Sequence, residues 1–307
     1  MTTNGGFTRR QFIASSTAAI SASIIPSMLQ GAQRESAASK YKMGLQLFTI
    51  NSIIGRDVPG TLKRVAAIGY QDCETYGYDP EKRTYYGMPI AAFKQTLADN
   101  QLVTTSGHYD FARYFAQPAD ELTRFVDRCI EGASALGQRY ITWPWLDPSS
   151  RSIEKFKQLT GKLNAIGEQV NKAGLGFAYH NHDFEFIDHD GQIGYDIILK
   201  ETDPRLVKLQ IDLYWVMHSS KRSPSELFSL QPGRFVMWHI KDMDKVSRDY
   251  TEMGNGSIDY TKILPDASRA GLQYYYIEQG GNFAINPMDS ITKSAAFFKK
   301  NLAQYLS

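Results

Sequence analysis

The sequence LGFAYHNHDFEF, residues 175–186, joins a short strand pattern to a cluster of groups that can bind metal or transfer protons. Alternate residues of a strand share a face, so Gly176, Ala178 and His180 lie on one side and two aromatic residues on the other. Small residues on one face and large ones on the other suit a tight barrel covered by helices. We therefore expect His180 at the carboxyl end of an inward-facing file, with His182 in the following loop.

Three later apolar runs end in a similar way. VKLQID ends at Asp212, RFVMWHIKD contains His239, and YYYIEQ contains Glu278. Counted from His180, the steps are 32, 27 and 39 residues, about one strand-plus-helix unit of an eight-stranded barrel of roughly 250 residues. Because parallel strands end at one rim of such a barrel, the four side chains are expected to converge there.

This group contains two imidazoles and two carboxylates. The set predicts one divalent metal ion, Mn, Co, Fe, Ni or Zn, and argues against calcium, on the ligands His180, Asp212, His239 and Glu278. Each residue alone has a simpler explanation, because single histidines are often structural and strand-end carboxylates often cap helices. Their common register favours the metal site.

Residues 1–38 have the features of a targeting segment. The sequence TRRQFI, residues 8–13, is a twin-arginine pattern, and an apolar run rich in Ala and Ser follows it. A membrane anchor is the alternative, but the run is too short and too polar to span a bilayer well. We expect a twin-arginine signal peptide that is removed, a periplasmic protein, and no stable membrane insertion.

Residues 39–307 are predicted to form one α/β domain. Strand and helix patterns alternate eight times, with longer polar loops after the strands; residues 102–108 read as the third strand, residues 119–136 as a helix ended by Gly137, and residues 260–270 as a later helix. A doubly wound sheet would usually show a glycine-rich phosphate loop, which this sequence lacks. The pattern therefore favours a single (β/α)8 TIM barrel.

Charge restricts the partners. The net charge is +2 and no basic run appears, so nucleic acid is not an expected partner. A small carbohydrate is the expected substrate, and a homodimer is left open.

Several stretches match motifs of a known family: GLQLFT, GTLKRVAAIGYQDCE, AYHNHDFEF, LQIDLYWV, WHIKDMD, GNGSIDY and YYYIEQ. Over residues 41–305 the chain resembles the xylose isomerase-like TIM barrels, and within them bacterial sugar phosphate isomerase/epimerase proteins. The resemblance implies a divalent metal on His180, Asp212, His239 and Glu278. Sugar epimerases carry Glu at the position of His180, so one of their two acid/base groups is replaced here. The HNH pattern instead resembles the inosose dehydratase branch, and branches that cleave 3-keto-glycosides are similar in outline.

The chemistry that this resemblance implies is proton abstraction next to a carbonyl. Glu278 would be a metal ligand and the base, and His182 a second acid/base group. Lys241 shares the inward file with His239, so it could hydrogen-bond the developing oxyanion. A surface salt bridge from Lys241 to Asp242 or Asp244 is the alternative.

Further residues are candidates for substrate binding. Glu74 and His108 end the second and third predicted strands and could contact sugar hydroxyls. Aromatic residues could stack on a pyranose face or simply pack in the core, and these are Trp143, Trp145, Tyr214 and Trp215.

Three functions compete at this point. The first is a metal-dependent sugar isomerase or epimerase that works through a metal-stabilised enediolate. The second is a lyase or hydratase of keto-sugars, such as an inosose or a 3-keto-glycoside. The third is a metal-containing carbohydrate-binding protein without turnover. A related nuclease is disfavoured, because it would need several metals and a basic surface.

Overall fold

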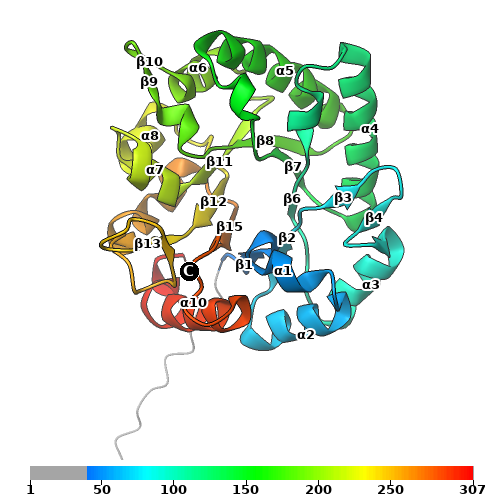
Figure 1. Cartoon of the computed structure of the whole chain (residues 1–307), viewed down its shortest axis with the longest axis vertical. Helices are drawn as coiled ribbons and strands as arrows, with labels where there is room; N and C mark the ends of the chain where they lie inside the picture. Colours follow the sequence, from blue (N-terminus) through cyan, green and yellow to red (C-terminus); the bar gives the residue numbers. More distant parts are fainter. Residues whose placement is uncertain (1–39, 307) are drawn as a thin grey trace, which may run out of the picture. The chain divides into compact units, whose positions relative to one another are not determined.

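Eight parallel strands form the centre of residues 40–306, the part of the chain that the computed structural model describes (Figure 1). The twin-arginine leader predicted for residues 1–38 lies outside the described residues. The strands are β1 (Met43–Gln46), β2 (Asp72–Glu74), β6 (Ser106–His108), β7 (Tyr140–Trp143), β8 (Gly176–His180), β11 (Lys208–Asp212), β12 (Met237–Ile240) and β15 (Tyr274–Ile277). Their spatial order is β2-β1-β15-β12-β11-β8-β7-β6.

The sheet is nearly closed where β2 meets β6. Parallel bridges pair Asp72 with Val103 and Thr75 with Gly107. Between them the Thr105 amide donates to the Asp72 carboxylate at 3.1 Å instead of to a neighbouring carbonyl. This side-chain bond interrupts the ladder, so β6 is shorter than the strand predicted for residues 102–108. The predicted eight-stranded TIM barrel is confirmed.

Helices surround the barrel (Figure 1). They are α1 (Asn51–Ile54), α2 (Val58–Ile68), α3 (Ile90–Asp99), α4 (Ala119–Leu136), α5 (Ile153–Lys172), α6 (Gly194–Glu201), α7 (Leu213–Ser219), α8 (Pro224–Leu230), α9 (Ala267–Ala270) and α10 (Pro287–Asn301). Short 3-10 helices are η1 (Leu47–Ile50), η2 (Phe111–Tyr114), η3 (Pro148–Ser150), η4 (Phe184–Phe186), η5 (Tyr260–Lys262), η6 (Leu264–Asp266) and η7 (Ala303–Leu306). Helix α4 has the predicted bounds because its apolar face is regular and Gly137, with φ of 84°, ends it.

Small antiparallel sheets follow several barrel strands. The predicted loop after β2 contains β3 (Tyr78–Asp79), β4 (Thr84–Tyr85) and β5 (Met88–Pro89). Two hairpins pair β9 (Asp188–His189) with β10 (Gln192–Ile193), and β13 (Asp242–Met243) with β14 (Tyr250–Thr251). The helix predicted for residues 260–270 is broken into η5, η6 and α9, because Pro265 lacks an amide hydrogen.

The two ends of the barrel interior differ in polarity. A small cluster of buried side chains fills the amino end of the barrel: Tyr140, Ala178, Val236, Met237 and Tyr276. The carboxyl ends of the strands carry buried polar residues, including Glu74, Gln210 and Asp212. The candidate site therefore lies at the carboxyl end of the barrel.

Two further features bear on the predicted export of the protein: the state of its cysteines and the hydropathy of its helices. Cys73 and Cys129 are buried free thiols, and burial raises the pKa of both. Among the helices of residues 40–306, none is both long and apolar enough to cross a membrane.

Candidate metal centre and active site

The four predicted metal ligands meet at the carboxyl rim of the barrel. Asp212 pairs directly with His239 across β11 and β12, and the Glu278 amide bonds to Ile240 O at 3.1 Å. One ligand atom each from Asp212, His239 and Glu278 lie within 4.8 Å of one another. His180 Nε2 lies 3.7 Å from Asp212 Oδ2. The shared register of the strands thus brings all four side chains together.

This donor set fits one divalent metal ion. All four side chains are buried, and imidazole nitrogens with carboxylate oxygens suit first-row transition ions. Within residues 40–306, His180 Nδ1 is buried and has no hydrogen-bond partner. His180, Asp212, His239 and Glu278 are therefore the residues that would hold the ion.

Glu74 contacts the other side of the His239 ring. His239 Nε2 lies 2.5 Å from Glu74 Oε2, while His239 Nδ1 lies 2.6 Å from Glu278 Oε2. Burial alone lowers the pKa of His239, but the two carboxylates outweigh it and raise that pKa to about 9. A carboxylate behind a ligand histidine fixes the ring orientation and raises its basicity. Glu74 therefore has the geometry of a positioning residue.

The predicted contact between Glu74 and a sugar hydroxyl is not possible from its position in the structure. Its side chain is fully buried and also accepts hydrogen bonds from Gln46 Nε2 at 2.7 Å and Gln210 Nε2 at 2.5 Å. The alternation along β2 does turn Glu74 toward the barrel axis, as predicted. Its side chain lies too deep in the barrel, however, to line the cavity described below.

Lys241 lies among the predicted ligands. Its Nζ atom is 2.7 Å from Asp212 Oδ2 and 2.9 Å from Glu278 Oε2. Burial opposes the charge of Lys241, but both carboxylates raise its pKa above the usual value. Burial likewise raises the pKa of Glu278, yet Lys241 and His239 lower it well below its usual range. The ammonium thus compensates both carboxylates.

The structure does not contain the alternative predicted for Lys241, a surface salt bridge to Asp242 or Asp244. Lys241 is only 3% exposed. Asp242 instead accepts backbone hydrogen bonds, among them those from Gly254 at 2.8 Å and Gly256 at 3.1 Å. It therefore orders the loop after β14.

A buried glutamate fixes the loop that carries His182. Glu185 Oε2 accepts from the His182 amide at 2.8 Å, and Glu185 Oε1 accepts from Tyr179 Oη at 2.7 Å. Burial raises the pKa of Glu185 to about 8. The His182 ring lies 4.9 Å from the His180 ring, and burial lowers the pKa of His182 well below its usual value. A neutral imidazole therefore faces the site.

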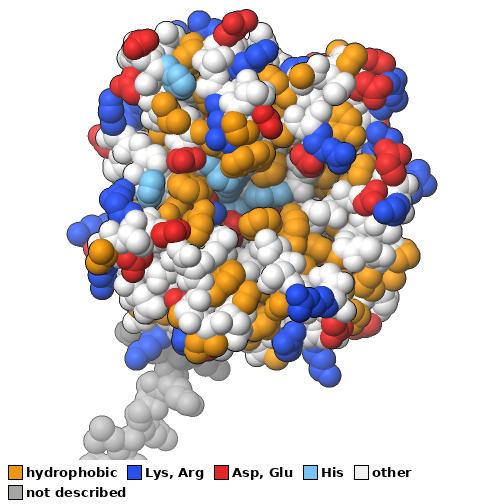
Figure 2. Space-filling model, viewed as in Figure 1, with side chains coloured by type: hydrophobic (Ala, Val, Ile, Leu, Met, Phe, Trp, Pro, Cys, Tyr) orange, Lys and Arg blue, Asp and Glu red, His pale blue; other side chains and the backbone are white. Residues whose placement is uncertain are grey.

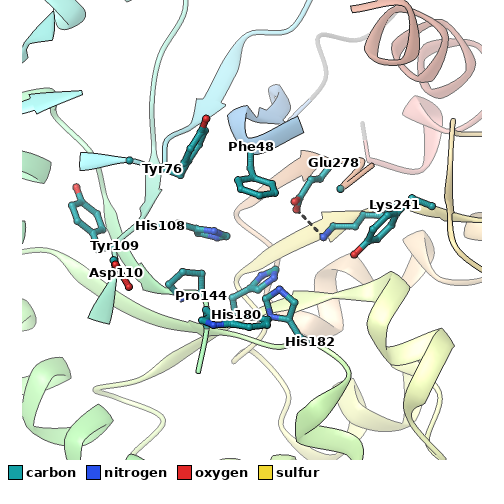
Figure 3. Close-up of a pocket in the computed structure, with 14 residues that line it drawn as sticks. Phe48, Tyr76, His108, Tyr109, Asp110, Pro144, His180, His182, Lys241 and Glu278 are labelled. Carbon is teal, nitrogen blue, oxygen red and sulfur yellow. Dashed lines mark ion pairs between the residues drawn. The ribbon is translucent and has the colours of Figure 1, made fainter. Parts of the chain in front are cut away.

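A cavity of about 460 Å³ opens above this cluster. It is lined by Phe48, Tyr76, Gly77, His108, Tyr109, Asp110, Pro144, Trp145, His180, His182, Lys241, Tyr250, Glu278 and Gly280. Figure 2 shows histidines in the hollow and hydrophobic side chains around it. Figure 3 shows several of these side chains pointing into the same space. The cavity thus combines a polar floor with largely aromatic walls.

Among the predicted substrate contacts, His108 and Trp145 line this cavity. The Nε2 atom of His108 lies 2.6 Å from Gln210 Oε1 and 3.3 Å from Glu74 Oε2, so the ring is fixed from beneath. Burial lowers the pKa of His108. Its neutral ring is thus held at the cavity surface.

Trp143 and Tyr214 lie outside the cavity, and core packing explains both. Trp143 is fully buried and stacks on Phe111 at 5.2 Å, because alternation along β7 turns it toward the helices. The Tyr214 hydroxyl donates to Arg248 O at 2.8 Å, and its ring packs on Tyr250 at 4.9 Å. Tyr214 thereby supports Tyr250, and Trp143 Nε1 donates to Trp145 O at 2.6 Å; Tyr250 and Trp145 both line the cavity.

Besides Tyr109, three aromatic residues of the lining were not identified as candidates. Phe48 follows β1 in η1, Tyr76 belongs to the loop after β2, and Tyr250 lies in β14. The only signal for them was the concentration of tyrosines and glycines in the loops that follow strands.

Similarity to known proteins agrees with this geometry. Residues 62–301 match the family model described as xylose isomerase-like TIM barrel. No curated protein matches the chain. A sugar phosphate isomerase/epimerase from Parabacteroides distasonis has a similar structure, with a TM-score of 0.76 and 25% identity over 89% of this chain and 97% of its own.

Two more solved structures share the fold. The IOLI protein with a bound zinc atom has a TM-score of 0.68 and 16% identity, over 87% of this chain and 99% of its own. L-ribulose 3-epimerase has a TM-score of 0.66 and 16% identity, over 86% and 95%. The family match spans most of the barrel. The chain therefore belongs to the xylose isomerase-like TIM barrel family.

Proposed function

We propose that this protein is a divalent-metal-dependent sugar isomerase or epimerase that removes a proton next to a carbonyl and passes through an enediolate. The observation that carries the proposal is the convergence of His180, Asp212, His239 and Glu278 beneath a cavity with aromatic walls. A metal ion bound by these residues would polarise the carbonyl and the neighbouring hydroxyl of the sugar. Solved neighbours that are sugar isomerases and epimerases support the same class of enzyme.

Glu278 and His182 are the proposed proton-transfer groups. Both line the cavity, and Figure 3 shows them on opposite sides of it. Glu278 is ionised, since Lys241 and His239 hold its pKa low, so it can accept the carbon-bound proton. His182 is neutral, so it would first take up the proton of the hydroxyl next to the carbonyl and would then, as an imidazolium, return a proton to the adjacent carbon. Lys241 lies beside Glu278 and would stabilise charge on the enediolate oxygen.

Elimination from a keto-sugar or a keto-glycoside is the second candidate. His180 and His182 are adjacent at the cavity, with ring centroids 4.9 Å apart, where sugar epimerases would have a carboxylate in place of His180. An imidazole that has first taken up a proton from the substrate can protonate a leaving hydroxyl or alkoxide. The same first step, proton removal by Glu278, serves both reactions.

Proton exchange in deuterated water tests the proposal. Keto-sugars and 3-keto-glycosides are incubated with the metal-loaded protein, and NMR follows loss of the α-proton. We expect exchange with the wild type and a decrease of at least ~10²-fold in Glu278→Gln, the lower range for a general base. Glu131→Gln is the control, because Glu131 forms an exposed pair with Arg83. Isomerised product identifies the first candidate, and eliminated water or alcohol the second. No exchange in the wild type would instead indicate a binding protein.

A further inference from the structure

Two large aromatic side chains are exposed on the cavity walls. Phe48 is 43% exposed and Trp145 is 42% exposed, and both line the cavity. Large apolar side chains at a concave site commonly mark a surface that a ligand covers. Neither residue contributes to the metal cluster, so the proposed proton-transfer chemistry does not account for them.

Trp145 is held firmly in place. The Arg151 guanidinium lies 4.3 Å from its ring centroid and donates two hydrogen bonds to Leu146 O, at 3.0 and 2.8 Å. The Phe184 ring meets the indole edge to face at 5.4 Å. A rigid aromatic surface loses little conformational entropy when a ligand binds.

The facing wall is also aromatic. Phe48 packs against Tyr76 at 5.3 Å, and Tyr76 packs against Tyr86 at 5.2 Å. Figure 3 shows Phe48 and Tyr76 across the cavity from Pro144 and His182. Trp145 follows Pro144 in the chain and contacts the His182 ring at 5.2 Å. The two exposed rings therefore belong to opposite sides.

The exposed rings lie farther from the barrel interior than the predicted metal ligands do. His182 separates Trp145 from the cluster, because its ring is 4.9 Å from His180 and 5.2 Å from Trp145. The cavity of about 460 Å³ falls within the range that accommodates drug-sized ligands. A monosaccharide bound directly at the cluster would lie on the side of His182 away from Trp145.

The charges disfavour a phosphate at this outer position. Among the described residues that line the cavity, Lys241 is the only Lys or Arg, and Asp212 and Glu278 already pair with it. Asp110 adds an exposed negative charge to the lining. A phosphate dianion there would lose water and gain no free cation.

We propose that the substrate is a glycoside whose sugar ring itself carries the carbonyl, instead of a sugar phosphate. Its sugar ring would lie over the metal cluster, and an aglycone with a flat apolar face would lie between Phe48 and Trp145. This inference rests on the proposed function, which places the sugar at the cavity floor. An aromatic ring and a second pyranose both present such a face.

Equilibrium binding without turnover tests the subsite. Calorimetry compares four derivatives of one sugar: the methyl glycoside, the phenyl glycoside, the disaccharide and the 6-phosphate, in gluco, galacto and xylo series where they exist. For the series that binds, we expect the phenyl glycoside or the disaccharide to bind at least ~10-fold more tightly than the methyl glycoside. Trp145→Ala and Phe48→Ala should abolish this preference and retain bound metal. Tyr305→Ala is the control, because Tyr305 is 37% exposed and lies outside the cavity.

The outcomes separate the alternatives. A preference for the phenyl glycoside assigns an aromatic aglycone, and a preference for the disaccharide assigns a sugar. Equal binding of the methyl glycoside, tighter binding of the 6-phosphate, or no binding by any glycoside would overturn the inference. Failure of the proposed function appears separately, as absent α-proton exchange, because the binding preference needs no reaction.

Discussion

Lys241 Nζ lies 2.7 Å from Asp212 Oδ2, so a buried ammonium occupies part of the space among the proposed metal ligands. It also lies 2.9 Å from Glu278 Oε2. A divalent ion held by Asp212 and Glu278 would provide the same charge compensation. Lysine and metal are therefore expected to compete for these two carboxylates.

The first prediction concerns Lys241→Met. Removing one partner of a buried ion pair costs about 3–5 kcal/mol, so the metal-free variant should unfold at lower temperature. Added Zn²⁺ should raise the Tm of Lys241→Met more than that of the wild type, because the ion replaces the lost positive charge. Lys262→Met, which removes an exposed pair with Asp259, is the control. Equal zinc-induced shifts would show that Lys241 and the metal do not share the carboxylates.

The second prediction concerns His239→Ala. His239 lies between Glu74 and Glu278 and offers its Nδ1 atom toward the cluster. We expect one metal ion per chain in the wild type and its loss from the purified variant, as measured by elemental analysis after dialysis. His218→Ala should retain it, since His218 bonds to Ser219 and is outside the cluster. Full occupancy in folded His239→Ala would remove this residue from the ligand set.

The third prediction uses the buried carboxyl of Glu185. Its pKa is raised from 4.5 to about 8, so between these values the folded protein binds a proton that the unfolded chain has released. Folding stability should therefore fall as pH rises through this window, by at most about 1.4 kcal/mol per pH unit from this group.

Glu185→Gln removes this titration. Gln can still accept from the His182 amide, and its NH₂ group can donate to Tyr179 Oη, so the loop should remain folded. Urea unfolding at pH 5 to 8 should show a flatter stability profile and a gain at pH 8. An unchanged slope would mean that Glu185 is ionised throughout this range.

The fourth prediction separates two neighbouring tryptophans. Trp143→Ala should destabilise the protein by about 3–5 kcal/mol, because it removes a fully buried ring. Trp145→Ala should cost much less, since its ring is 42% exposed. Denaturant unfolding of both variants gives the comparison. Equal losses would contradict the different roles assigned to the two rings.

The fifth prediction concerns residues outside the described part of the chain. We propose export by the twin-arginine route, so Arg9→Lys with Arg10→Lys should trap the protein in the cytoplasm, because a receptor reads the arginine pair. Cell fractionation measures the distribution. Normal export of the double variant would indicate the general secretory route.

Periodicity explains why the fold and the inward-facing cluster could be predicted. The four predicted metal ligands lie at or next to the carboxyl ends of β8, β11, β12 and β15, and parallel strands turn alternate residues to one interior. Helix ends were also readable where a cap is local, as at Gly137.

Other features depend on contacts between distant segments. Glu74 accepts from His239, 165 residues away in the chain, and its burial follows only from the closed barrel. Phe48 and Tyr250 reach the cavity from segments outside the barrel strands, where the alternation of strand residues does not predict the direction of a side chain. The outward direction of Trp143 was readable from alternation along β7, but an aromatic residue near a strand end resembles a sugar platform.

The direction of the barrel strands also has a practical consequence. The described chain enters β1 at its amino end, opposite the rim that carries the cavity. Helix α10 runs back toward that same side, where Lys299 Nζ bonds to Ile68 O just before β2, at 2.7 Å. A handle attached near residue 40 or after Leu306 would therefore leave the cavity open to solution. Immobilised protein should keep its full capacity for sugar ligands whichever end is tethered.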